Sequence, residues 1–160
     1  MRLIALCLTL LVSVAACETS IGTIIGIGGS GGVSQAQAVG NWSFTVHPTS
    51  TLGCTTGSLP DGQVLTAHLD VLSDGTLATA TSTWQNPPAT VIRPLTGAIN
   101  LTTGFTDLFM SASSGSGAAM ELRGTMTSVG SFTGTLTDPA PGSFQVFGAC
   151  SYTASGTKTG

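Results

Sequence analysis

The chain has 160 residues, enough for one domain of ordinary size, and only 7% of them are charged, against about 25% in a typical soluble domain. Hydrophobic residues make up 41% of the sequence, so the chain can bury a core despite its low charge. The formal net charge is −3, from four Lys and Arg against seven Asp and Glu. Because the sequence has no basic cluster to neutralise phosphates, it argues against binding to nucleic acid or to anionic lipid headgroups by charge.

The first residues have the pattern of a bacterial secretory leader. Arg2 gives a positive start, and residues 3–14 form an apolar run. The run is shorter than the roughly 20 residues that a helix needs to span a bilayer. Its length suits the apolar region of a signal peptide, so we expect export from the cytoplasm.

The leader ends in the motif Val14-Ala15-Ala16-Cys17. This motif resembles the lipobox of bacterial lipoproteins, in which an aliphatic residue and two small residues precede an acylated cysteine. The resemblance implies that residues 1–16 are removed and that acyl chains on Cys17 anchor the protein in a lipid bilayer. Glu18 stands where Asp often retains such proteins at the inner membrane, so the resemblance favours the outer membrane. An ordinary secretory signal followed by a chance cysteine is the alternative.

Residues 17–39 are rich in Gly and Ser and show neither a helical nor an alternating period. They are therefore predicted to form a flexible tether after the acylated cysteine. Two catalytic patterns occur in this tract: residues 26–31 match the dinucleotide-binding fingerprint and residues 28–32 match the nucleophile elbow. Both motifs need a strand-to-helix turn, which the tether does not offer, so we assign them no chemistry.

Apolar and polar residues alternate from Gly40 onward. In the first segment Trp42, Phe44 and Val46 share one face, and polar residues occupy the other. Similar segments follow, separated by turn signals such as Asp-Gly and Asn-Pro-Pro. The pattern predicts an all-β domain over residues 40–160, an antiparallel up-and-down meander of about eight strands without a helix. Such a meander is expected to close into a small barrel, and a two-sheet β-sandwich is the alternative.

Two cysteines are left after Cys7 leaves with the leader and Cys17 is acylated. These are Cys54, just after the first predicted strand, and Cys150, in the last. In an oxidising compartment we expect them to form a disulfide, and the first and last strands of a closed barrel are neighbours.

Gly40-Asn41-Trp42 resembles the Gly-x-Trp that opens the first strand of lipocalins and avidin-like barrels, where the Trp plugs one end. The resemblance covers three residues and the strand pattern. No ligand-binding residue can be transferred on it.

No residue set in the sequence supports catalysis, and we expect a protein that is not an enzyme and has neither cofactor nor metal. His47, His68 and Asp70 lie on polar strand faces, where we expect ordinary surface residues and not zinc ligands. Glu121 and Arg123 stand at strand spacing on one face, which predicts a surface ion pair.

The sequence therefore predicts a lipid-anchored protein of the bacterial cell envelope whose β-domain is a non-enzymatic interaction or structural module. The alternative is a calycin-like barrel that carries a small apolar ligand. A packed interior favours the first, and an open cavity above about 300 Å³ with inward polar groups favours the second. The aromatic girdles of transmembrane barrels are missing, which argues against a membrane-spanning barrel. The sequence identifies no protein partner or ligand.

Overall fold

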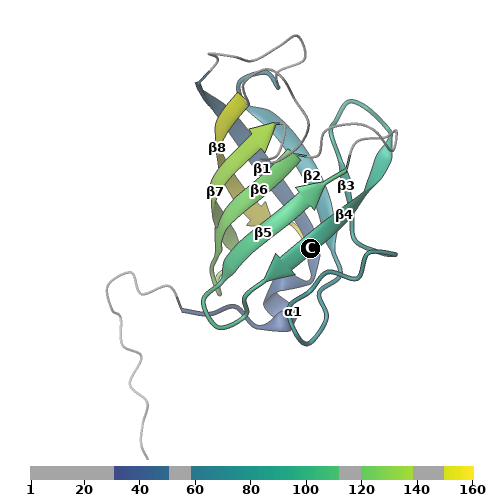
Figure 1. Ribbon diagram of the computed structural model, residues 1–160, viewed down its shortest axis with the longest axis vertical. Helices are drawn as coiled ribbons and strands as arrows, with labels where there is room; N and C mark the ends of the chain where they lie inside the picture. Colours follow the sequence, from purple (N-terminus) through teal and green to yellow (C-terminus); the bar gives the residue numbers. More distant parts are fainter. Residues whose placement is uncertain (1–30, 51–58, 112–119, 139–149) are drawn as a thin grey trace, which may run out of the picture.

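The structure, a computed structural model, describes residues 31–50, 59–111, 120–138 and 150–160 (Figure 1). These residues form one short helix and eight strands: α1 (Gln35–Ala38), β1 (Gly40–Ser50), β2 (Gln63–Leu69), β3 (Thr83–Gln85), β4 (Ile92–Ile99), β5 (Phe105–Met110), β6 (Met120–Met126), β7 (Ser131–Asp138) and β8 (Cys150–Lys158). Each strand pairs antiparallel with the next along the chain, and β8 pairs antiparallel with β1. The prediction of an all-β, eight-stranded up-and-down barrel is confirmed, and the sandwich alternative is wrong because the β1–β8 pairing closes the sheet.

Alternating burial explains why these segments form strands. Along β8 the residues Tyr152, Ala154 and Gly156 are buried, and the hydroxyl residues between them are exposed. Phe44 of β1 lies opposite Leu65 of β2 on one side and Gly156 on the other, so three strands contribute to one layer of the core. The two-residue period of a strand sends every second side chain into the barrel.

Aromatic side chains fill part of the barrel interior. The rings of Trp42 and Phe44 are stacked, with centroids 6.1 Å apart, and Phe44 meets Phe132 edge to face at 5.3 Å. Glycines make the room for these rings. A Cβ placed on Gly156 would lie 2.5 Å from Cδ1 of Phe44, and one on Gly134 would lie 2.7 Å from Cζ of Phe132. This level of the interior is therefore packed.

One end of the barrel is covered by the segment that precedes β1. Val33 and Ala38 are 1% and 0% exposed, and both belong to the core. Ser34 caps α1: its Oγ accepts from the backbone N–H of Gln37, while Oε1 of Gln37 accepts from the backbone N–H of Ser34. The indole N–H of Trp42 donates to the carbonyl oxygen of Ala38 at 2.8 Å.

Residues 33–39, which the sequence predicts to be part of a flexible tether, are therefore packed against the barrel and include one turn of helix. The chain is already tied to the barrel at Val33, whose backbone N–H donates to Leu101 at 3.0 Å. A helix of one turn is too short to give a periodic signal, which is why the alternation marked only the start of β1. In the described part of the chain, no helix is both long and apolar enough to cross a membrane.

Candidate functional site

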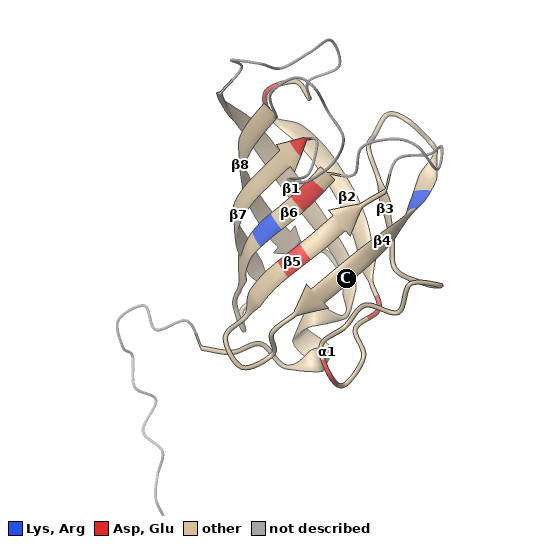
Figure 2. Cartoon of the chain, viewed as in Figure 1, with Lys and Arg blue, Asp and Glu red and all other residues tan. Residues whose placement is uncertain are grey.

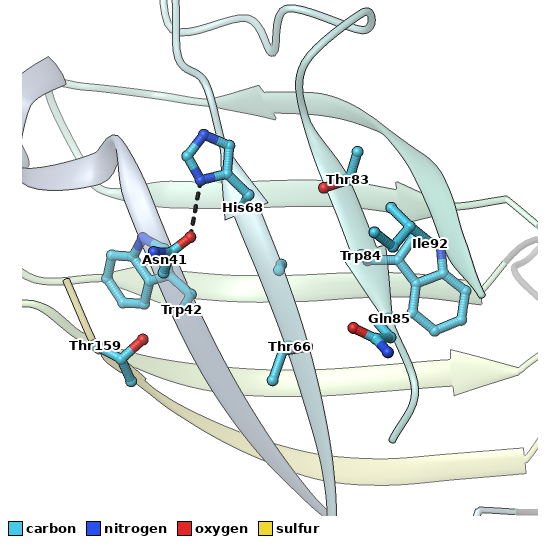
Figure 3. A pocket seen from close by; sticks show the side chains of 10 residues that line it. Asn41, Trp42, Thr66, His68, Thr83, Trp84, Gln85, Ile92 and Thr159 are labelled. Atoms are coloured by element: carbon cyan, nitrogen blue, oxygen red, sulfur yellow. Dashed lines mark hydrogen bonds between the residues drawn. The ribbon is translucent and has the colours of Figure 1, made fainter. Parts of the chain in front are cut away.

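A groove of about 380 Å³ lies on the outer side of the barrel, over β1, β2 and β3 (Figure 3). Strand β3 is only three residues long, and it pairs with residues 66–68 of β2 and 92–94 of β4. Three residues that face the barrel interior contribute to the lining: Trp42, Ala67 and Trp84. The other lining residues are Asn41, Thr66, His68, Thr83, Gln85, Ile92 and Thr159.

Hydrogen bonds fix part of the groove. Nδ1 of His68 lies 2.9 Å from Oδ1 of Asn41. Because an amide oxygen only accepts, the ring donates from Nδ1, and Nε2 of the neutral ring is left as an acceptor. The Gln85 amide nitrogen donates to the carbonyl oxygen of Ala89 at 2.7 Å, which leaves Oε1 of Gln85 available.

A charged cluster lies elsewhere, on β5 and β6 (Figure 2). The guanidinium of Arg123 is 3.0 Å from Oδ2 of Asp107 and 3.7 Å from Oε1 of Glu121. The expected pair of Glu121 and Arg123 is present, but Glu121 is far less exposed than expected, with only 9% of its side chain accessible. Sequence alternation places Glu121 on the outer face; it cannot show that Phe109 and Thr137 flank it on the neighbouring strands.

The two carboxyl groups of this cluster influence each other's charge. Burial raises the pKa of Glu121, and hydrogen bonding to and repulsion from Asp107 raise it further, while Arg123 acts in the opposite direction. Oδ1 of Asp107 is buried and accepts no hydrogen bond from the described residues.

The histidines do not come together. His47 pairs with Asp61 at 2.8 Å, and both are exposed. His68 stands opposite Asn41 in the β1–β2 register, six residues along β1 from His47, which corresponds to roughly 20 Å of strand. Asp70 accepts a hydrogen bond from the hydroxyl of Thr81. Among the described residues, no group of three or more His, Cys, Asp or Glu could hold a metal ion.

The cysteine predictions fall mostly outside the described residues, since Cys17 and Cys54 both lie there. Cys150 begins β8, is 5% exposed and takes part in a disulfide bond. Its pairing with Cys54 and the acylation of Cys17 stay predictions.

Polar residues that sequence reasoning missed face inward at the end of the barrel opposite α1. The Arg93 guanidinium lies 5.3 Å from the centroid of the Trp84 ring. The Tyr152 hydroxyl accepts from the backbone N–H of Leu59 at 3.0 Å. Burial raises the pKa of Asp138 and that of Tyr152. Arg93 and Asp138 each occupy the core-facing phase of their strand, a signal that was present in the alternation.

A scan against protein-family models, a search of curated proteins and a search of solved structures each returned no match to this chain. Of the suspected likeness to lipocalins and avidin-like proteins, the structure therefore supports the eight-stranded closed barrel and no particular family.

Proposed function

We propose that this chain is a lipid-anchored protein of the bacterial envelope, with a barrel that serves as a non-enzymatic interaction or structural module. The observation that carries the proposal is the packed aromatic level of the barrel interior. Trp42, Phe44 and Phe132 fill that level, each at most 1% exposed. With this level filled by the protein's own side chains, the outer face becomes the surface on which contacts with other molecules are made.

The envelope location rests on the leader and on Cys17. A diacylated cysteine supplies the two hydrophobic chains that stable membrane attachment requires, and no basic surface is needed for it. Glu18 favours the outer membrane, on its periplasmic or surface side, over the inner membrane.

The anchor is tested by replacing the acylated residue. Cys17→Ser should abolish incorporation of radiolabelled palmitate and move the protein from the membrane fraction to the soluble fraction. Cys7→Ser is the matched control: it changes a cysteine inside the leader and should leave both readouts unchanged. Palmitate incorporation that survives Cys17→Ser would contradict the lipoprotein assignment.

A carrier of a small apolar ligand is the second candidate. It is favoured by Arg93 and Asp138, which face inward opposite α1 and form no ion pair with each other or with another described residue. Native mass spectrometry of the protein purified from its own host distinguishes the two candidates. A retained small molecule would appear as added mass and would favour the carrier, and an unmodified mass apart from the acyl chains would favour the interaction module.

A further inference from the structure

The groove over β1, β2 and β3 has no charged side chain among its described lining residues. The charged cluster of Asp107, Glu121 and Arg123 lies on β5 and β6, which do not contribute to the groove (Figure 2). A bound anion or cation would therefore find no fixed counter-charge among the described residues that line the groove. A neutral ligand needs no counter-charge.

The groove offers hydrogen-bonding groups of both kinds. The hydroxyls of Thr66 and Thr83 form no hydrogen bond within the described part of the chain, so each is available to donate and to accept. His68 Nε2 and Gln85 Oε1 add acceptors, because the other polar atom of each side chain is already engaged. Figure 3 shows these side chains on adjacent strands around one hollow, with Asn41 beside His68.

An apolar contact stands beside these polar groups. Ile92 lines the groove and is 65% exposed, which is high for a residue of its size. The groove therefore combines neutral donors, neutral acceptors and one aliphatic surface in a volume of about 380 Å³, within the size range of small-ligand sites.

We propose that this groove binds an uncharged saccharide. Sugar hydroxyls donate and accept, as the Thr66 and Thr83 hydroxyls do, and the C–H face of a sugar ring is apolar enough to rest on Ile92. An apolar ligand would instead cover the hydroxyl and amide groups without replacing their hydrogen bonds to water. The choice of a saccharide rests on the proposed envelope location, where the protein would meet glycans.

Titration of the full chain, purified with its anchor in detergent micelles, tests this site. N,N′-diacetylchitobiose and maltotriose serve as neutral probes, followed by NMR through the side-chain amides of Asn41 and Gln85 and the ring of His68. We expect saturable shifts at these signals with at least one probe. Thr66→Val keeps the β-branched shape but removes one hydroxyl, and it should weaken binding by about three- to tenfold, as the loss of one neutral hydrogen bond predicts.

Thr133→Val is the matched control, because Thr133 is an exposed, outward-facing residue of β7, away from the groove. It should leave the affinity unchanged, and both variants should melt like the parent protein. Absence of saturable shifts with both probes would overturn the proposal, as would equal binding by the Thr66→Val variant. A response to phosphatidylglycerol vesicles in place of the saccharides would also overturn it. Palmitate labelling reports the anchor independently, so failure of the groove and failure of the envelope location are separable.

Discussion

Gly156→Ala probes the packed level of the barrel on which the proposed function depends. The new Cβ would lie 2.5 and 2.8 Å from Cδ1 and Cε1 of Phe44 and 3.2 Å from Cβ of Phe132. Contacts under 3 Å force the ring to move, yet Phe44 is fully buried between Trp42, stacked on it, and Phe132, edge-on to it. Such overpacking typically costs about 1–3 kcal/mol.

Two smaller effects oppose this cost. Burying one more carbon is worth about 0.8 kcal/mol, and restricting the unfolded chain adds about 0.4–1 kcal/mol. Because the Phe44 ring has another aromatic ring on each side, we expect a strain cost near or above the upper end of the range for overpacking. The net loss in the free energy of unfolding should then be roughly 1–2 kcal/mol. For a domain of this size the melting temperature should fall by roughly 3–12 °C.

The assay is thermal and urea unfolding followed by circular dichroism. Ser155→Ala, at the adjacent exposed position, is the control and should stay within about 0.5 kcal/mol of the parent. The double variant Phe44→Leu with Gly156→Ala should be less destabilised than the sum of the single variants, with a coupling of at least about 0.5 kcal/mol. If Gly156→Ala is as stable as the parent, the Phe44 ring does not fill that space, and the carrier becomes the better interpretation.

Three further outcomes follow from the same structure. Removing residues 33–39 should lower the free energy of unfolding by about 3 kcal/mol or more, because it uncovers the closed end of the barrel and leaves the Trp42 indole without its acceptor. An unchanged urea midpoint would instead support a flexible tether over these residues. Folding raises the pKa of Glu121, so the parent protein loses stability as the pH rises through the folded-state pKa of this carboxyl. The stability of the Glu121→Gln variant relative to the parent should therefore increase with pH, and stability curves that run parallel would contradict this. Peptide mass mapping of the unreduced protein should recover Cys54 linked to Cys150, and an alkylatable thiol at Cys54 would contradict that pairing.

The fold was accessible from sequence because strand burial is a local, two-residue signal. Trp42, Phe44 and Val46 are buried as their spacing predicts. The helix that covers the end of the barrel was missed, although one local signal was present. Ser34 and Gln37 have the spacing of a capping box, and the structure contains both of its hydrogen bonds. A single helical turn in a Gly- and Ser-rich stretch is too short to produce a hydrophobic period, so the capping box is the one local signal of it.

The candidate sites depend on register, which the sequence does not specify. Alternation predicts that Asn41, His68 and Thr83 point outward; only the pairing of β1 with β2 and of β2 with β3 brings them into one row. Likewise, the side chain of Glu121 is buried although alternation places it on the outer face, because Phe109 and Thr137 flank it on β5 and β7. Alternation in the sequence therefore predicts which face of a strand a residue occupies, but not which residues lie beside it on the neighbouring strands.

The low charge of the chain has a consequence for recognition. Hydroxyl side chains point outward on three adjacent strands, β7, β8 and β1, at Thr133, Thr135, Thr153, Ser155 and Thr45. Interactions of neutral hydroxyls are short-ranged and nearly insensitive to salt, whereas paired charges would steer a ligand from a distance. A ligand of the groove over β1, β2 and β3, where Thr66 and Thr83 likewise present neutral hydroxyls, must therefore be selected by close hydrogen-bond geometry, which is the kind of recognition that an uncharged, hydroxyl-rich molecule permits.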